Sequence, residues 1–148
     1  MQAIVLIGPQ ASGKSSFCRA HLFSSHVRLN LDMLRTRHRE RVLLEACIAA
    51  KQAMVIDNTN PTRADRARYL PALRAAGFGV LAYWFDDSYE RCAVRNEARE
   101  GQARVPEVGL KHYFARFQRP RIDEGFDGVF RVQAEGGDFL IEACPDEV

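Results

Sequence analysis

Short apolar runs alternate with longer, partly polar stretches along most of the chain. Each apolar run is bounded by glycine, proline or polar residues, which is typical of buried strands. The predicted strands are residues 2–7, 27–29, 53–56, 80–85 and 128–132. The predicted helices are residues 14–23, 32–50, 60–76 and 106–118, with a further helix that begins at Ser88. Residues 139–143 are ambiguous.

Strands that alternate with helices predict βαβ units, and hence an α/β fold with a five-stranded parallel sheet flanked by helices. Ligands of such sheets bind beyond the carboxyl ends of the strands. Several polar segments follow predicted strands and are expected to meet at that edge: residues 8–15, 30–32, 57–60 and 86–87. Asn60 is expected to cap the helix over residues 60–76, with Pro61 as its first residue.

Length and composition narrow the class of protein. A chain of 148 residues suits one domain, and 47% hydrophobic with 27% charged residues is ordinary for a globular protein. The net charge of +2 gives no strong field for nucleic acid, and the four widely spaced cysteines predict no zinc site. No membrane span, signal peptide or stable protein partner is evident, so a cytoplasmic location is expected.

The segment Gly8-Pro9-Gln10-Ala11-Ser12-Gly13-Lys14-Ser15 fits the pattern G-x-x-x-x-G-K-[ST] between a strand and a helix. Successive backbone N–H groups of such a loop point inward at phosphate oxygens, and the helix N-terminus adds positive charge. Lys14 is expected to reach the β- and γ-phosphates of ATP, and the Ser15 hydroxyl to ligate Mg²⁺. With Ser16 as a further binding residue, the segment predicts a P-loop NTPase/kinase fold.

A second polar segment, Asn30-Leu31-Asp32-Met33-Leu34-Arg35, follows the second predicted strand. Asp32 and Arg35 are one helical turn apart, so both can face the same side. A carboxylate there can accept the proton of an acceptor hydroxyl, and an arginine can hold a phosphate or keep the carboxylate ionised. Asp32 is equally suited to helix N-capping, and the residues alone leave both roles open.

Asp57 and two arginines complete the candidate site. Asp57 ends the third strand, where an acidic residue usually lies near Mg²⁺, although it can also cap the next element. Arg95 and Arg99 share one helix face. Because an interrupted segment follows, residues 95–108 are expected to form a lid whose arginines clamp the phosphates of ATP. A solvated helix face is the alternative.

Taken together, these segments resemble the kinase module of the 5′-hydroxyl polynucleotide kinases of bacteriophages and animals. The resemblance extends from Ile4 to about Val132. Its most specific part is Asp57-Asn58-Thr59-Asn60-Pro61 followed by Arg66-Ala67-Arg68-Tyr69. Further matching stretches are Asn30-x-Asp32-x-x-Arg35, Arg95-Asn96-x-x-Arg99, Val105-Pro106 and Glu124-Gly125-Phe126.

The resemblance implies a role for each of these residues. Asp32 would be the general base for the 5′-hydroxyl, Arg35 would hold the 3′-phosphate of the acceptor, and Arg99 would be the lid arginine on the phosphate donor. Lys14 and Ser15 would serve ATP and Mg²⁺, and Asp57 the metal or acceptor side. The chain departs from the family at Gln10-Ala11, where Pro-Gly is usual. It also lacks a D-x-D-x-T phosphatase signature, so no 3′-phosphatase activity is expected.

The acceptor is the least determined part of the prediction. A basic run at Arg35, Arg37, Arg39 and Arg41, with a second patch at Arg63, Arg66 and Arg74, would suit a nucleic-acid backbone or only a solvated face. The leading prediction is an ATP-dependent kinase that acts on the 5′-hydroxyl end of a polynucleotide. The alternatives are a small-molecule kinase for a nucleoside, sugar or antibiotic, and a nucleotide-binding regulatory ATPase module.

Overall fold

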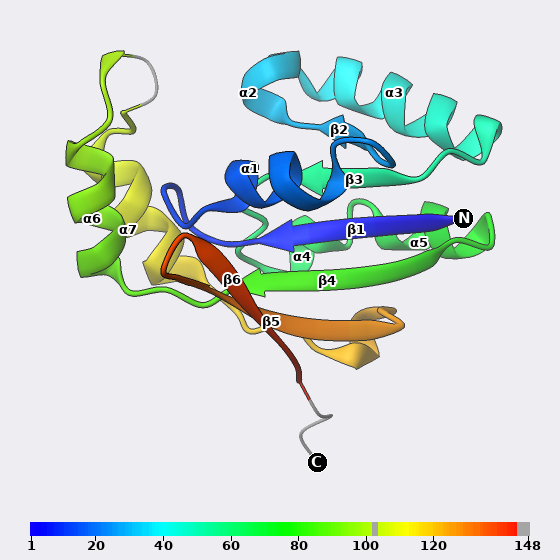
Figure 1. Cartoon of the computed structure of the whole chain (residues 1–148). Coiled ribbons are helices and arrows are strands. Elements are labelled where there is room, and N and C mark those ends of the chain that lie inside the picture. Colours follow the sequence, from blue (N-terminus) through cyan, green and yellow to red (C-terminus); the bar gives the residue numbers. More distant parts are fainter. Residues whose placement is uncertain (102–103, 145–148) are drawn as a thin grey trace.

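The computed structural model describes residues 1–101 and 104–144 and contains one six-stranded sheet in the order β2-β3-β1-β4-β5-β6 (Figure 1). The strands are β1 (Gln2–Ile7), β2 (Val27–Leu29), β3 (Met54–Asp57), β4 (Gly79–Phe85), β5 (Gly128–Glu135) and β6 (Asp138–Ala143). The first five are parallel, which confirms the predicted α/β class. The ambiguous segment is β6, which pairs antiparallel with β5 and makes the sheet one strand larger than predicted.

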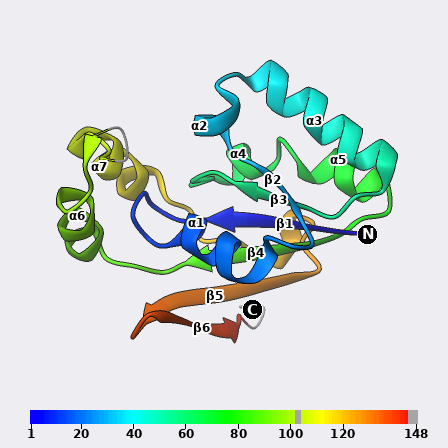
Figure 2. The same ribbon diagram turned by 45° about the horizontal axis from the view of Figure 1, so that its top comes forward.

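Helices cover both faces of this sheet (Figure 2). They are α1 (Lys14–Phe17), the π-helix η1 (Cys18–Leu22), α2 (Leu31–Leu34), α3 (Arg37–Ala50), α4 (Arg63–Arg66), α5 (Leu70–Ala75), α6 (Tyr89–Glu97), α7 (Glu107–Arg116) and the 3-10 helix η3 (Ile122–Glu124). Within the described residues, no helix combines the length and the apolar character that crossing a membrane requires.

Two helices that the sequence predicts as continuous are interrupted. Residues 32–50 divide at Arg35, whose φ of 76° ends α2, and the Thr36 side chain then caps α3. Residues 60–76 divide into α4 and α5, and the cap of α4 is Thr62. The predicted capping role of Asn60 is therefore wrong. Asn60 is buried with a φ of 46°, and its amide donates to the Leu6 carbonyl at 2.9 Å, which fastens the loop after β3 to β1.

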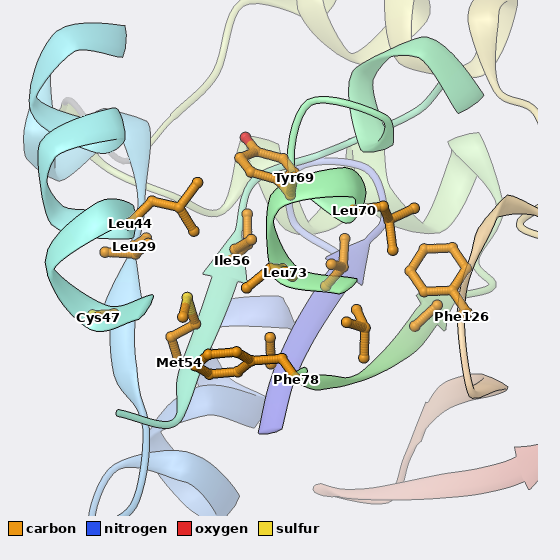
Figure 3. Packing of buried hydrophobic residues seen from close by; sticks show 14 of the residues in the cluster. Leu29, Leu44, Cys47, Met54, Ile56, Tyr69, Leu70, Leu73, Phe78 and Phe126 are labelled. Carbon is orange, nitrogen blue, oxygen red and sulfur yellow. The ribbon is translucent and has the colours of Figure 1, made fainter. Parts of the chain in front are cut away.

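The alternation of side chains along β1 divides the core into two layers. Ala3, Val5 and Ile7 face α3 and α5, while Ile4 and Leu6 face α1 and η1. Figure 3 shows the first layer, in which leucines of α3 and α5 meet Met54 and Ile56 of β3. Because both faces of the central strands are covered, these strands read as continuous apolar runs in the sequence.

Arg66 and Glu124 form a buried ion pair that joins distant parts of the chain. The Arg66 side chain is 0% exposed, and its Nε and Nη2 atoms donate to the two Glu124 carboxylate oxygens at 2.8 and 3.0 Å. Its Nη1 atom donates to the carbonyls of Asn60 and Pro61. The basic pattern had predicted Arg66 as part of a surface patch, and its burial shows that this prediction is wrong. Arg66 holds the turn after β3 against η3 instead.

Candidate active site

The phosphate loop lies between β1 and α1, at the carboxyl-terminal edge of the sheet (Figure 1). Its shape depends on two glycines. A Cβ atom at Gly8 would lie 2.8 Å from Phe85 Cβ and 2.9 Å from Ser12 Oγ, so no larger residue fits there. Gly13 has a φ of 99°, which L side chains rarely adopt. Ala11 also has a positive φ, 64°, so it keeps the backbone shape that a glycine would allow more easily.

Lys14 is buried inside this loop. Its Nζ atom donates to the carbonyls of Gly8 and Pro9, both at 2.7 Å. Burial lowers the pKa of Lys14 to about 8, and the nearby Asp57 carboxylate partly opposes that shift. The positive charge of Arg99 lowers the pKa of Lys14 further, because Arg99 lies within electrostatic reach of the loop. An anion in the loop would stabilise the charged amine that burial disfavours.

Two buried polar atoms of the loop lack a partner among the described residues, Ser12 Oγ and Gln10 Oε1. Ser12 is 2% exposed, and an unpaired hydroxyl at that depth costs free energy. A bound phosphate oxygen would accept its hydrogen bond. The unpaired donor, the lysine amine and the glycine-dependent backbone together fit the phosphates of a nucleotide.

The expected metal ligands Ser15 and Asp57 lie in direct contact. Parallel pairing of β1 with β3 sets Leu6 beside Asp57, and Asp57 Oδ2 accepts a hydrogen bond from Ser15 Oγ at 3.2 Å. Hydroxyl and carboxylate oxygens are ligands that Mg²⁺ prefers. In the described part of the chain, no cluster of three or more His, Cys, Asp or Glu forms a metal cage. The hydroxyl and carboxylate of this pair suit Mg²⁺, which usually takes its other ligands from water and phosphate oxygens.

Arg28 contacts both of these residues, which the sequence analysis missed. Its Nε atom donates to Asp57 Oδ2 at 2.8 Å and its Nη2 atom to Ser15 Oγ at 3.2 Å. The signal was present in the sequence, since Arg28 interrupts the apolar residues of β2. Its register partner on β3 is Val55, which packs in the α1 layer, so strand pairing sets Arg28 on the same side as the loop.

The segment that carries Asp32 is hydrogen-bonded to the end of β3. Asn30 caps α2 by accepting from the Met33 N–H, and its amide donates to the Asp57 carbonyl at 2.6 Å. The Leu31 N–H donates to Asn58 Oδ1 at 2.9 Å. Asp32 is exposed in the first turn of α2 and is not its cap. Of the two roles left open for Asp32, capping is therefore excluded.

Asn58 is held in turn by a buried polar network. Its Nδ2 atom donates to Glu40 Oε2 at 2.9 Å and to the Tyr69 hydroxyl at 3.2 Å, and that hydroxyl donates to Glu40. Arg37 Nη1 contacts Glu40 and Tyr69 at 2.8 and 3.0 Å. Glu40 is 2% exposed and Tyr69 0% exposed. From the sequence, this region was interpreted as the basic start of a helix. The one signal of a buried polar network was Glu40, the single acidic residue among these arginines.

The predicted lid arginines differ in their contacts. Arg95 donates to the Ala11 carbonyl at 3.0 Å and forms an ion pair with Asp87, so it touches the phosphate loop itself. Arg99 follows the C-terminal end of α6 and is half-buried. Asn96 exchanges two hydrogen bonds with the backbone of Val105, at 2.6 and 2.8 Å, which joins α6 to a residue just before α7. Residues 102 and 103 of the predicted lid lie outside the described residues.

Comparison with known families agrees with this arrangement. The AAA_33 family model, described as an AAA domain, matches residues 36–120, which is more than half of the chain. The chain belongs to the AAA_33 family. The match begins after the phosphate loop and after Asp32. The geometry of the phosphate loop in this AAA_33 protein is therefore independent of the family match, which does not include the loop.

A curated relative of this AAA_33 protein is the bifunctional polynucleotide phosphatase/kinase of Schizosaccharomyces pombe. The two are 29% identical over 138 residues, which cover 88% of this chain and 33% of the relative. The chain spans about a third of the length of the two curated relatives it matches. This similarity confirms the resemblance to polynucleotide kinases that the motifs predict.

Two solved structures show the same fold. Chaetomium thermophilum Kti12 in complex with ADP-AlF3 superposes with a TM-score of 0.66 at 16% identity, covering 88% of each chain. A gluconokinase from Sinorhizobium meliloti 1021 superposes with a TM-score of 0.61 at 19% identity, covering 89% of this chain and 82% of the other. The AAA_33 protein therefore has the P-loop kinase fold that the sequence predicts.

The structure brings most of the predicted site residues to one edge of the sheet. The loop Gly8 to Ser15 is joined to Asp57 through Ser15 and to Arg95 through Ala11. Asp32 and Arg35 lie on α2 and at its end, next to the carboxyl terminus of β3, and both are exposed. Ser16 is also exposed, beside Ser15 in the first turn of α1.

Proposed function

We propose that this protein is an ATP-dependent kinase that transfers the γ-phosphoryl group of Mg–ATP to the 5′-hydroxyl end of a polynucleotide. The observation that carries the proposal is the attachment of α2 to the end of β3. Asn30 and Asn58 fix the turn of Asp32 to the strand that also supplies Asp57. The candidate acceptor residues and the phosphate loop therefore share one edge of the sheet.

On the donor side, the loop binds and orients the nucleotide. Backbone N–H groups and the Ser12 hydroxyl donate to phosphate oxygens, and Lys14 leaves the carbonyls of Gly8 and Pro9 for the β- and γ-phosphates. Ser15 and Asp57 would hold Mg²⁺, which when bound neutralises charge on the phosphates. Arg95 and Arg99 add positive charge from the proposed lid over residues 95–108 of this single domain.

On the acceptor side, Asp32 would accept the proton of the attacking hydroxyl. It is exposed and not a helix cap, so its carboxylate is available to a substrate. Arg35 would hold the 3′-phosphate of the acceptor nucleotide as a forked, permanently charged donor. Positioning of the hydroxyl in line with the γ-phosphorus then supplies most of the rate enhancement.

The choice of a polynucleotide is supported by the 29% identical relative and by the residues that carry the resemblance. Two of those segments, Arg66 to Tyr69 and Glu124 to Phe126, have a physical role here. Arg66 and Glu124 fix the turn after β3, and Tyr69 fixes Asn58 in that turn. These two segments, which are among those shared with polynucleotide kinases, therefore support the turn beside the candidate acceptor residues.

The proposal is tested with ATP labelled in the γ-phosphate and a panel of acceptors. The panel holds 5′-hydroxyl DNA, 5′-hydroxyl RNA, a 3′-nucleoside monophosphate and small alcohols that include sugars. Labelling of oligonucleotides, with sugars unlabelled, is the expected result. Labelling of small alcohols alone would make the protein a small-molecule kinase and would overturn the proposed acceptor.

A further inference from the structure

Arg28 occupies the place where a metal ion is expected to bind. Its guanidinium group donates to Asp57 Oδ2 at 2.8 Å and to Ser15 Oγ at 3.2 Å, and these are the two oxygens that would ligate Mg²⁺. Ser15 Oγ in turn donates to the same Asp57 oxygen at 3.2 Å. A single positive side chain thus bridges both expected ligands.

The contacts of Arg28 compete with metal ligation. Mg²⁺ binds its oxygen ligands at about 2.0–2.1 Å in a strict octahedral geometry, which requires lone pairs that face the ion. Asp57 Oδ2 already accepts two hydrogen bonds, and the Ser15 oxygen accepts one from Arg28. A divalent ion and a guanidinium on the same carboxylate oxygen would also repel each other at short range.

Asp57 needs a positive partner when no metal is bound. Its side chain is 2% exposed, and a buried carboxylate without a partner is strongly disfavoured. Lys14 does not fill this role through contact, because its amine donates to the carbonyls of Gly8 and Pro9. Arg28 supplies the nearby charge, and its ion pair with Asp57 replaces the charge that the metal would bring.

The Arg28 side chain has open space into which it can move away from Ser15 and Asp57. Its side chain is 36% exposed, while that of Asp57 is buried. It also lines an open cavity of about 690 Å³, together with Arg19, Leu22, Phe23 and His26 from η1 and the segment before β2. Rotation of Arg28 into this cavity would free both oxygens without moving a core residue.

We infer that Arg28 is a displaceable counter-ion of Asp57, which leaves Ser15 and Asp57 when Mg²⁺ binds and so sets the Mg²⁺ concentration needed to bind nucleotide. The inference rests on the metal site of the proposed function, but not on the identity of the acceptor. In the metal-free protein Arg28 stabilises the buried carboxylate, and in the loaded protein it points to solvent.

The test titrates Mg²⁺ into the full chain with a fixed concentration of a fluorescent ADP analogue. Arg28→Gln removes the competing charge, so half-saturation is expected at a Mg²⁺ concentration about tenfold lower than in the unaltered protein, within the usual range of coupling between sites. Arg19→Gln is the matched control, since it removes a positive charge from the same cavity. Its half-saturation should equal that of the unaltered protein.

A second readout separates displacement from a purely structural role. Without Mg²⁺, Arg28→Gln should unfold at a lower temperature than the unaltered protein, and the difference should vanish at saturating Mg²⁺ and ADP. Arg28→Lys keeps the charge but not the two-atom contact, and its half-saturation should lie between the two. An unchanged or raised half-saturation in Arg28→Gln, or a thermal deficit that persists with Mg²⁺ and ADP, would overturn the inference.

These results are independent of the acceptor assay. A lowered Mg²⁺ requirement in Arg28→Gln, together with unlabelled oligonucleotides, would support the counter-ion and refute the polynucleotide acceptor. Labelled oligonucleotides with an unaltered Mg²⁺ requirement in Arg28→Gln would support the polynucleotide acceptor and refute the counter-ion role of Arg28.

Discussion

Lys14 and Asp32 carry the two charges on which the proposed reaction depends, and they lie in opposite environments. Lys14 is buried in the loop, where two carbonyls hold its amine. Asp32 is exposed in the first turn of α2, and Asn30 caps this helix in its place. The sequence predicted both residues as site members. Their environments depend on neighbours that are distant in the chain, so sequence alone could not predict them.

The lowered pKa of Lys14 predicts a pH dependence of nucleotide binding. Phosphates stabilise the protonated amine, so its pKa is higher in the complex than the value of about 8 in the free protein. Affinity should therefore be highest below pH 8 and should weaken by up to about tenfold per pH unit above it. Binding of a fluorescent ADP analogue between pH 7 and pH 9.5 measures this. Lys14→Arg, which stays charged, should lose the dependence, and a flat profile in the unaltered protein would contradict the assignment.

Asp32 should affect the chemical step and not nucleotide binding. Asp32→Asn keeps the shape of the side chain but removes the base, so the rate of phosphoryl transfer should fall by about 10²- to 10⁴-fold. Affinity for the ADP analogue should stay unchanged, because Asp32 is not part of the loop. Asp123→Asn, which removes a carboxylate from an exposed ion pair with Arg63, is the control and should keep full activity. Equal rates in Asp32→Asn and the control would rule out Asp32 as the base.

At the scale of elements, the strands follow directly from the sequence and the helices do so only in part. The central parallel strands β1 and β3 are buried on both faces, so their apolar runs are clear in the sequence. The helical pattern, in contrast, runs across Arg35 and across residues 67–69, where the helices are interrupted. Thr36 caps the new helix α3 after the first break. After the second break, α5 begins at Leu70 without a side-chain cap, and the preceding Tyr69 contacts Asn58 and Glu40 through its hydroxyl. The antiparallel β6 was ambiguous because all of its residues except Phe139 are exposed, so its apolar residues do not follow burial.

The polar network of Glu40, Asn58 and Tyr69 predicts that Tyr69→Phe changes both the free energy of unfolding and the KM for the acceptor. Without the Tyr69 hydroxyl, buried Glu40 loses one hydrogen-bond donor, and Asn58 and Arg37 each lose the oxygen to which they donate. The free energy of unfolding, measured in urea, should fall by about 1–3 kcal/mol. The KM for the acceptor should rise while ADP affinity is unchanged, because Asn58 positions α2 and not the loop. Tyr89→Phe, whose hydroxyl bonds Glu107 at the surface, should change neither quantity.

Equal changes of acceptor KM and ADP affinity in Tyr69→Phe would mean that the network serves the whole domain. That outcome would contradict the assignment of Glu40, Asn58 and Tyr69 to the acceptor side.

At the scale of the molecule, contacts between distant segments hold the site edge together. The basic pattern indicated a surface patch at Arg63, Arg66 and Arg74, but of the neighbours Arg63 and Arg66 only Arg63 is exposed. Arg66 joins residues 60–61 to Glu124, near the last parallel strand. Charge patterns in the sequence cannot separate these two arginines, because burial is decided by which segment packs against them. The fold class and the phosphate loop were predictable, but the contacts by which Arg66 and Tyr69 support the acceptor side were not.

The buried pair predicts unequal effects of the two neighbouring arginines. Arg66→Ala leaves Glu124 buried without its partner, so the free energy of unfolding should fall by about 3–5 kcal/mol. Arg63→Ala breaks an exposed pair with Asp123 in the same region and should cost at most about 1 kcal/mol. Urea unfolding of both variants provides the comparison. Similar losses in the two variants would show that Arg66 contributes no more than a surface pair.

The most direct test of the proposed function is the position of the transferred phosphate. The protein is incubated with γ-labelled ATP, Mg²⁺ and two copies of one oligonucleotide, one with a 5′-hydroxyl and one with a 5′-phosphate. Label should enter only the 5′-hydroxyl strand, and digestion to nucleotides should recover it on the 5′-terminal residue. Absence of label from that strand, in protein that binds the ADP analogue normally, would contradict the account.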